Sequence, residues 1–125
     1  MKLLDTSVAV DHLRGERAAV DLMRALVNGG ESVAASEIVR FELLGGARDG
    51  ELEALELFFS AFSWLPVDED IARTAGSFAR THRRANRGID DADYLIAATA
   101  VRYEADLLTR NVRHFPMLTG LGPAY

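Results

Sequence analysis

The sequence predicts an α/β fold in which helices cover both faces of a parallel sheet. Short apolar segments, typical of buried strands, alternate along the chain with longer segments of helical periodicity. A length of 125 residues is enough for one domain with its own hydrophobic core. The composition, 49% hydrophobic and 26% charged, is ordinary for a globular protein. We therefore expect a single domain over residues 1–125.

The first half of the chain contains two candidate strands, each followed by helical segments. Glycines close the helical segments, as they commonly do at helix ends. The expected elements are a strand at 2–5, a helix from Ser7 to Leu13, a helix in "ERAAVDLMRALVNGG", a strand in "SVAAS" and a helix in "EIVRFELLGGA" capped by Ser36.

The second half repeats this alternation. "ELEALELFFSAFSWLPV" predicts a helix that runs into a short strand near Trp64–Val67. Asp68 or Asp70 can begin the helix "IARTAGSFARTHRRA", which Asn86 and Gly88 end. The remaining elements are a helix in "DDADYLIAATAVRYE", a strand in "ADLLTRN" and one last short strand in the tail from Pro116.

Composition excludes several classes of protein. There is no cysteine, hence no disulfide framework and no thiolate zinc site, and the three histidines are scattered. No apolar stretch reaches the ~18 residues of a membrane helix. The opening "MKLLDTSV" is too short and too soon charged for a signal peptide, so we expect a cytoplasmic protein without membrane contact. The net charge of −5 argues against passive coating of nucleic acid, and any metal would be held by oxygen.

Two acidic residues stand where apolar ones are expected. Asp5 ends the first apolar strand, and ligands of parallel sheets sit at the carboxyl ends of strands. On a helical wheel Glu42 lies between Ile38 and Val39, on the side opposite Arg40. A carboxylate there is costly unless it is paired or bound to a cation. A buried salt bridge with an arginine is the alternative to a functional site.

The segment "DDAD" at 90–93 carries three more acids. Asp90 and Asp93 have the spacing of a capping box, which is a structural explanation for both. Three aspartates in four residues nevertheless exceed what capping requires. Asp93 shares a helical stripe with Ala97 and Ala100, whereas Asp91 points elsewhere. If one of these acids joins Asp5 and Glu42, we expect it to be Asp93.

Converging carboxylates predict a metal. Without a cation they would repel one another and raise each other's pKa. Mg²⁺ or Mn²⁺ prefers carboxylate and water oxygens, and such clusters commonly assist attack of water on a phosphodiester.

With these positions assembled, the chain resembles a PIN-domain ribonuclease, specifically a VapC-type toxin of a bacterial toxin–antitoxin pair. The matching segments are "LLDTSV", "ASEIVRFELLGGA", "DADYLIAATA" and "LLTRNVRHF", in the order typical of the family. The resemblance implies an α/β/α sandwich around a parallel sheet of four or five strands. It also implies a Mg²⁺-dependent endonuclease site with Asp5, Glu42 and Asp93 as metal-binding acids.

One position departs from the family. Many relatives have a fourth acid after the "TR" of the last segment, where this chain has Asn111. Asparagine brings no charge, so we expect one tightly bound Mg²⁺, with Asn111 orienting water. Thr6 and Thr109 are expected to hydrogen-bond the acids or the water, and Asp91 to contact a metal-bound water.

The resemblance further implies RNA as substrate and a VapB-type antitoxin as partner, in a homodimer and in hetero-oligomers. A recessed acidic pocket favours single-stranded or looped RNA. Arginines are candidates for holding the flanking phosphates: Arg80, Arg83, Arg84, Arg87, Arg110 and Arg113. They can equally be solvated.

One apolar surplus and one rival function stay open, while two other functions are excluded. Leu57, Phe58, Phe62 and Trp64 exceed one helix face and serve either the core or an interface. A haloacid-dehalogenase phosphatase needs a second Asp where this chain has Ser7, and a receiver domain needs a late lysine, but Lys2 is the only lysine. A catalytically inactive PIN fold that only binds partners is the serious alternative.

Overall fold

The computed structural model describes all of residues 1–125 and contains one parallel sheet. Its four strands are β1 (Lys2–Leu4), β2 (Val33–Ser36), β3 (Ser63–Leu65) and β4 (Asp106–Leu108), in the order β3-β2-β1-β4. In the register, Leu3 pairs with Ala34 on one side and with Leu107 on the other. The predicted parallel sheet is therefore confirmed, with four strands.

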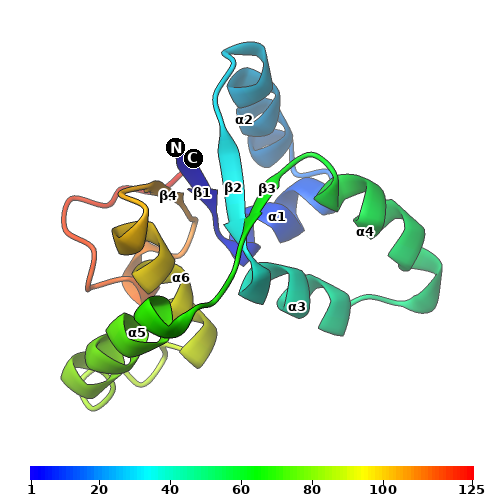
Figure 1. The fold of residues 1–125 in the computed structure, drawn as a ribbon. Helices are drawn as coiled ribbons and strands as arrows, with labels where there is room; N and C mark the ends of the chain where they lie inside the picture. Colours follow the sequence, from blue (N-terminus) through cyan, green and yellow to red (C-terminus); the bar gives the residue numbers. More distant parts are fainter.

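Six helices flank the sheet. They are α1 (Thr6–Leu13), α2 (Arg17–Asn28), α3 (Glu37–Gly45), α4 (Leu52–Phe59), α5 (Glu69–His82) and α6 (Asp91–Arg102), with short 3₁₀ turns η1 (Asp49–Glu51) and η2 (Val112–His114). Figure 1 shows α5 and α6 together on one side of the sheet and α1, α3 and α4 on the other. The predicted three-layer α/β/α arrangement is confirmed. No helix is both long and apolar enough to span a bilayer.

The central strands are buried on both faces, as strands of a helix-covered parallel sheet must be. Leu3 and Leu4 of β1 are at most 1% exposed, and Ala34 and Ala35 of β2 are fully buried. Ala97 of α6 belongs to the same core cluster, because a small side chain lets its helix approach the sheet closely. The residues immediately after the strands are thereby fixed against a rigid core.

The tail differs from expectation. Residues 116–125 form no strand, so the prediction of a last short strand in the tail is wrong. The tail makes a single ladder-like contact, in which the Ala124 N–H donates to the Thr109 carbonyl at 2.8 Å. Gly120 and Gly122 disfavour extended pairing and Pro123 has no N–H to donate, which explains why pairing does not propagate. The third strand likewise ends at Leu65, before Pro66, and does not continue to Val67.

The apolar surplus around α4 divides between core and surface. Phe58, Phe62 and Trp64 are partly buried and pack against the main core. The rings of Phe62 and Trp64 meet edge to face at 6.3 Å. Leu57 is 75% exposed. Core packing therefore accounts for three of the four side chains.

The sheet order itself marks a place for a site. The chain passes from β1 outward to β3 and then returns to the other side of β1 to form β4. Ligands of such sheets bind where the strand order reverses, at the carboxyl ends of the strands. In this chain that point lies between Asp5, which follows β1, and Thr109, which follows β4.

Candidate active site

Asp5 is a buried carboxylate at this reversal point. The residue is 3% exposed, and its Oδ2 accepts hydrogen bonds from Ser7 Oγ and Thr109 Oγ1, each at 2.7 Å. Oδ1 accepts no hydrogen bond from the protein. Two hydroxyl donors orient the group and offset part of the cost of burying its charge. One carboxylate oxygen is left for a ligand.

The donors to Asp5 also tie two distant segments together. Ser7 Oγ accepts from the Arg110 N–H at 3.2 Å, and Thr109 Oγ1 accepts from the Asn111 N–H at 2.9 Å. The segment after β4 is thus fastened to the beginning of α1. The predicted contact between Thr109 and an acid is present. Ser7 was not among the predicted site residues, although its place two residues after Asp5 was the available signal.

Glu42 lies on α3 beside the residue that follows Asp5. Thr6 Oγ1 donates to its Oε1 at 2.6 Å, as expected for a hydroxyl near the acids. Glu42 is half-buried and forms no ion pair with an arginine, and Arg40, two positions before it, is paired with Glu37 at 2.6 Å. The alternative of a buried salt bridge to arginine is therefore absent here.

Asp93 combines the two roles that the sequence left open. Its Oδ2 accepts from the Asp90 N–H at 3.0 Å in a capping box, and His114 Nδ1 lies 3.3 Å from the same oxygen. Its side chain is 13% exposed. Burial raises the pKa of Asp93 to about 6 and the charge of Asp5 adds to the increase, while the Asp90 N–H and His114 oppose it. Asp93 is therefore both a capping residue of α6 and a candidate site residue.

The charge of Asp5 contributes to the raised pKa of Asp93, which indicates that the first turn of α6 lies near the end of β1. His114 was not foreseen as a neighbour, because 21 positions separate it from Asp93 and no local pattern connects them. Asp91 instead faces α5, where Arg83 Nη2 donates to its Oδ1 at 2.6 Å on an exposed surface. The geometry offers no support for a contact between Asp91 and the site.

The predicted arginines fall into two groups. Arg80, Arg84 and Arg87 are exposed at and beyond the end of α5, near the Arg83–Asp91 ion pair. Arg110 and Arg113 lie with Asn111 around a separate cavity of about 350 Å³. Asn111 lines this cavity and lies two residues beyond Thr109, which donates a hydrogen bond to Asp5.

The side chains as placed do not form a ready-made metal cage. No three acidic or histidine side chains are grouped closely enough to hold an ion. Glu42 and Asp93 are each held by protein donors. The donor chemistry nevertheless fits a hard cation, because Asp5 has a free oxygen and repels Asp93. A cation here would relieve that repulsion, with Glu42 and Asp93 turning from their present partners.

Comparison with known proteins identifies the family of this chain. Residues 2–117 match the PIN domain family. The chain belongs to this family. It is 64% identical over 125 residues to Ribonuclease VapC19 of Mycobacterium tuberculosis (strain ATCC 25618 / H37Rv), covering all of both chains. It is 40% identical to Ribonuclease VapC10 of the same strain, covering 100% of this chain and 93% of that one.

Solved structures agree on the PIN architecture. A toxin–antitoxin complex from Klebsiella pneumoniae contains a chain with a TM-score of 0.80 and 26% identity, covering 100% of this chain and 98% of that one. VapBC-1 from nontypeable Haemophilus influenzae gives 0.78 and 26%, covering 96% and 93%. The resemblance seen in the four sequence segments is thus confirmed. All three acids of this PIN domain lie within the matched residues, whereas the last eight residues of the tail lie beyond them.

Proposed function

We propose that this protein is a metal-dependent endoribonuclease toxin that works in the cytoplasm and cleaves single-stranded or looped RNA. One observation carries the proposal: a buried, hydroxyl-oriented Asp5 at the strand-order reversal, close enough to Asp93 to raise its pKa. The 64% identity to a protein named as a ribonuclease supports the same activity.

Asp5, Glu42 and Asp93 would hold Mg²⁺ or Mn²⁺, which supplies charge stabilisation at a phosphodiester attacked by water. The chain provides the orientation. Ser7 and Thr109 direct Oδ2 of Asp5, and Thr6 directs Glu42. Asn111, two residues after Thr109, has a side-chain oxygen that can accept a hydrogen bond from water. With no fourth carboxylate, the site carries charge for one tightly bound cation.

Asp93 can also move a proton. A carboxyl whose pKa is about 6 exchanges its proton near neutral pH, where a general base is most effective. His114, 3.3 Å from the same oxygen, can share that proton. In the metal-free chain Asp93 can therefore take up a proton near neutral pH, whereas a bound cation would favour its ionised form.

The substrate must reach a recessed site. A single strand can bend its backbone toward Asp5, whereas a duplex presents a rigid, wide surface. Arginines stand on both approaches, at the end of α5 and after β4. Their planar guanidinium groups suit phosphate oxygens. We assign RNA-backbone contact to Arg80, Arg83, Arg84, Arg87, Arg110 and Arg113.

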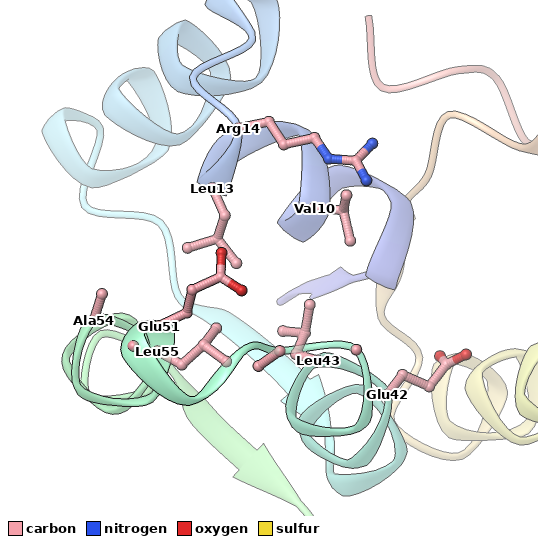
Figure 2. A pocket seen from close by; sticks show the side chains of 11 residues that line it. Val10, Leu13, Arg14, Glu42, Leu43, Glu51, Ala54 and Leu55 are labelled. Carbon is pink, nitrogen blue, oxygen red and sulfur yellow. The ribbon is translucent and has the colours of Figure 1, made fainter.

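A second surface suits an inhibitory partner of the VapB antitoxin type. A groove of about 440 Å³ lies between the end of α1, α3 and α4, with Val10, Leu43 and Leu55 among its apolar lining residues. Figure 2 shows these side chains directed into the groove, while the Glu42 carboxylate at its edge points away from it. An apolar antitoxin segment can fill the groove and present an arginine to Glu42.

The choice of occupant follows from the comparisons, since similar solved chains come from toxin–antitoxin complexes. A homodimer that binds antitoxin as a hetero-oligomer is part of the proposal. Phe41 is 68% exposed beside Glu42 and offers apolar area for such contacts. Light scattering with and without antitoxin measures both assemblies. A complex that contains a single copy of this chain would contradict the proposed homodimer.

The activity is tested with purified protein and a labelled single-stranded RNA. Cleavage should require Mg²⁺ or Mn²⁺, stop in EDTA and fall by orders of magnitude in Asp5→Asn. The matched control is Asp21→Asn, an exposed acid on α2. RNA binding without cleavage in any divalent cation would instead support the inactive binding module. Cleavage that persists under exhaustive chelation would exclude the metal.

A further inference from the structure

A cavity beside the acids has a lining of opposite character. It measures about 350 Å³ and is lined by Arg110, Asn111, Val112, Arg113, His114 and Pro123. Two of these six are arginines, one is a histidine and none is acidic. Such a lining selects anions, and its planar guanidinium groups favour phosphate oxygens.

An ion pair with Asp11 positions the Arg110 side chain. Its Nη1 lies 3.1 Å from Oδ2 of Asp11, whose side chain is 5% exposed. The Tyr125 hydroxyl donates to the same Asp11 oxygen. Burial, with the Asp11 carboxylate adding to it, raises the pKa of Tyr125, so this hydroxyl keeps its proton and remains a donor. The Arg110 side chain is still 54% exposed. Its remaining N–H donors are free for a ligand.

The backbone around the cavity is fastened to the acid site. The Arg110 N–H donates to Ser7 Oγ, and the Ala124 N–H donates to the Thr109 carbonyl. Thr109 itself binds Asp5. The cavity thus begins one residue after Thr109, whose hydroxyl orients the candidate metal-binding residue Asp5. A strand whose scissile phosphate lies at Asp5 would have a neighbouring phosphate within reach of this cavity.

We propose that the cavity is a subsite for an RNA phosphate next to the scissile one, with Arg110 and Arg113 as its ligands and Tyr125 as a positioning residue acting through Asp11. The inference rests on the proposed function and deepens it by separating these two arginines from those of α5. Tyr125 lies beyond residues 2–117, the part of the chain that matches the PIN family. The positioning contact therefore comes from a part of the tail that the family match does not include.

The test uses the full-length protein in EDTA, where RNA is bound but not cleaved, and a fluorescein-labelled single-stranded RNA. Each phosphate neutralised on a single strand contributes about 0.7 to the slope of log K against log salt. Because both arginines bind the same phosphate, Arg110→Gln/Arg113→Gln should lower the slope by about 0.7 and Arg113→Gln by part of that amount. Affinity at low salt should fall about tenfold per arginine. The exposed α2 variant Arg24→Gln is the control and should match wild type.

Tyr125 is tested by a double-mutant cycle. Tyr125→Phe should weaken binding in the wild-type background and add nothing in Arg110→Gln, because its effect passes through that guanidinium. Equal loss in both backgrounds would show a general structural effect and overturn the positioning role. An unchanged slope in Arg113→Gln would overturn the subsite even if Mg²⁺-dependent cleavage is present. A lowered slope without cleavage in Mg²⁺ would keep the subsite and reject the ribonuclease.

Discussion

Replacing Asp93 by asparagine should make the metal-free protein more stable at neutral pH, although it removes a site residue. The substitution keeps an oxygen that can cap the Asp90 N–H, which it now accepts at 3.0 Å. It removes a charge that folding places in a buried site beside Asp5. Because burial raises the pKa of Asp93 from 3.8 to about 6, ionising this carboxyl is harder in the folded chain than in the unfolded one.

The magnitude follows from the two pKa values. A difference of about two units corresponds to about 3 kcal/mol at 1.36 kcal/mol per unit. Between pH 4 and 6 the folded state binds more protons at this residue than the unfolded state does. Its contribution to stability therefore falls as pH rises and is lost above pH 6. Loss of the His114 contact offsets part of the gain in Asp93→Asn.

Urea unfolding in EDTA at a series of pH values measures the difference between wild type and Asp93→Asn. The free energy of unfolding of the variant should exceed that of wild type above pH 6, by up to about 3 kcal/mol, and converge with it near pH 4. Asp21→Asn, on the exposed face of α2, should track wild type throughout. Adding Mg²⁺ should stabilise wild type more than Asp93→Asn, and RNA cleavage by the variant should fall by orders of magnitude. A variant less stable than wild type at pH 8 would refute the argument.

Three further substitutions probe the surrounding contacts. Asp91→Asn breaks an exposed ion pair with Arg83, so the free energy of unfolding should change by less than about 1 kcal/mol and cleavage should persist; a loss of metal binding in calorimetry would show that Asp91 is part of the site. Thr109→Val removes a donor to buried Asp5 and should cost about 2 kcal/mol in urea unfolding and slow cleavage, whereas Thr109→Ser should restore both. Tyr94→Phe removes a buried hydroxyl with no partner and should stabilise the protein by about 1 kcal/mol, and destabilisation would reveal a missing hydrogen bond.

Much of the site could be predicted from local sequence. Asp5 directly follows a strand, so the chain direction alone placed it at a carboxyl end. The spacing of Asp93 from Ala97 and Ala100 follows helical periodicity, and periodicity does not depend on what the helix packs against. The capping box at Asp90 is also local, since its two partners are three residues apart. Such features are determined within one or two helical turns.

The remaining contacts depend on which strands become neighbours. Thr109 meets Asp5 across 104 positions only because β4 pairs with β1 at the edge opposite β3. Tyr125 reaches Asp11 across 114 positions because the tail runs past β4 without pairing as a strand. Helical periodicity and turn chemistry are silent on strand order, which is decided by packing of the whole core. The sequence by itself therefore determined the acids and the faces that carry them. Only the tertiary structure decided that Ser7 and His114 join the acids and that Asp11 and Tyr125 position Arg110.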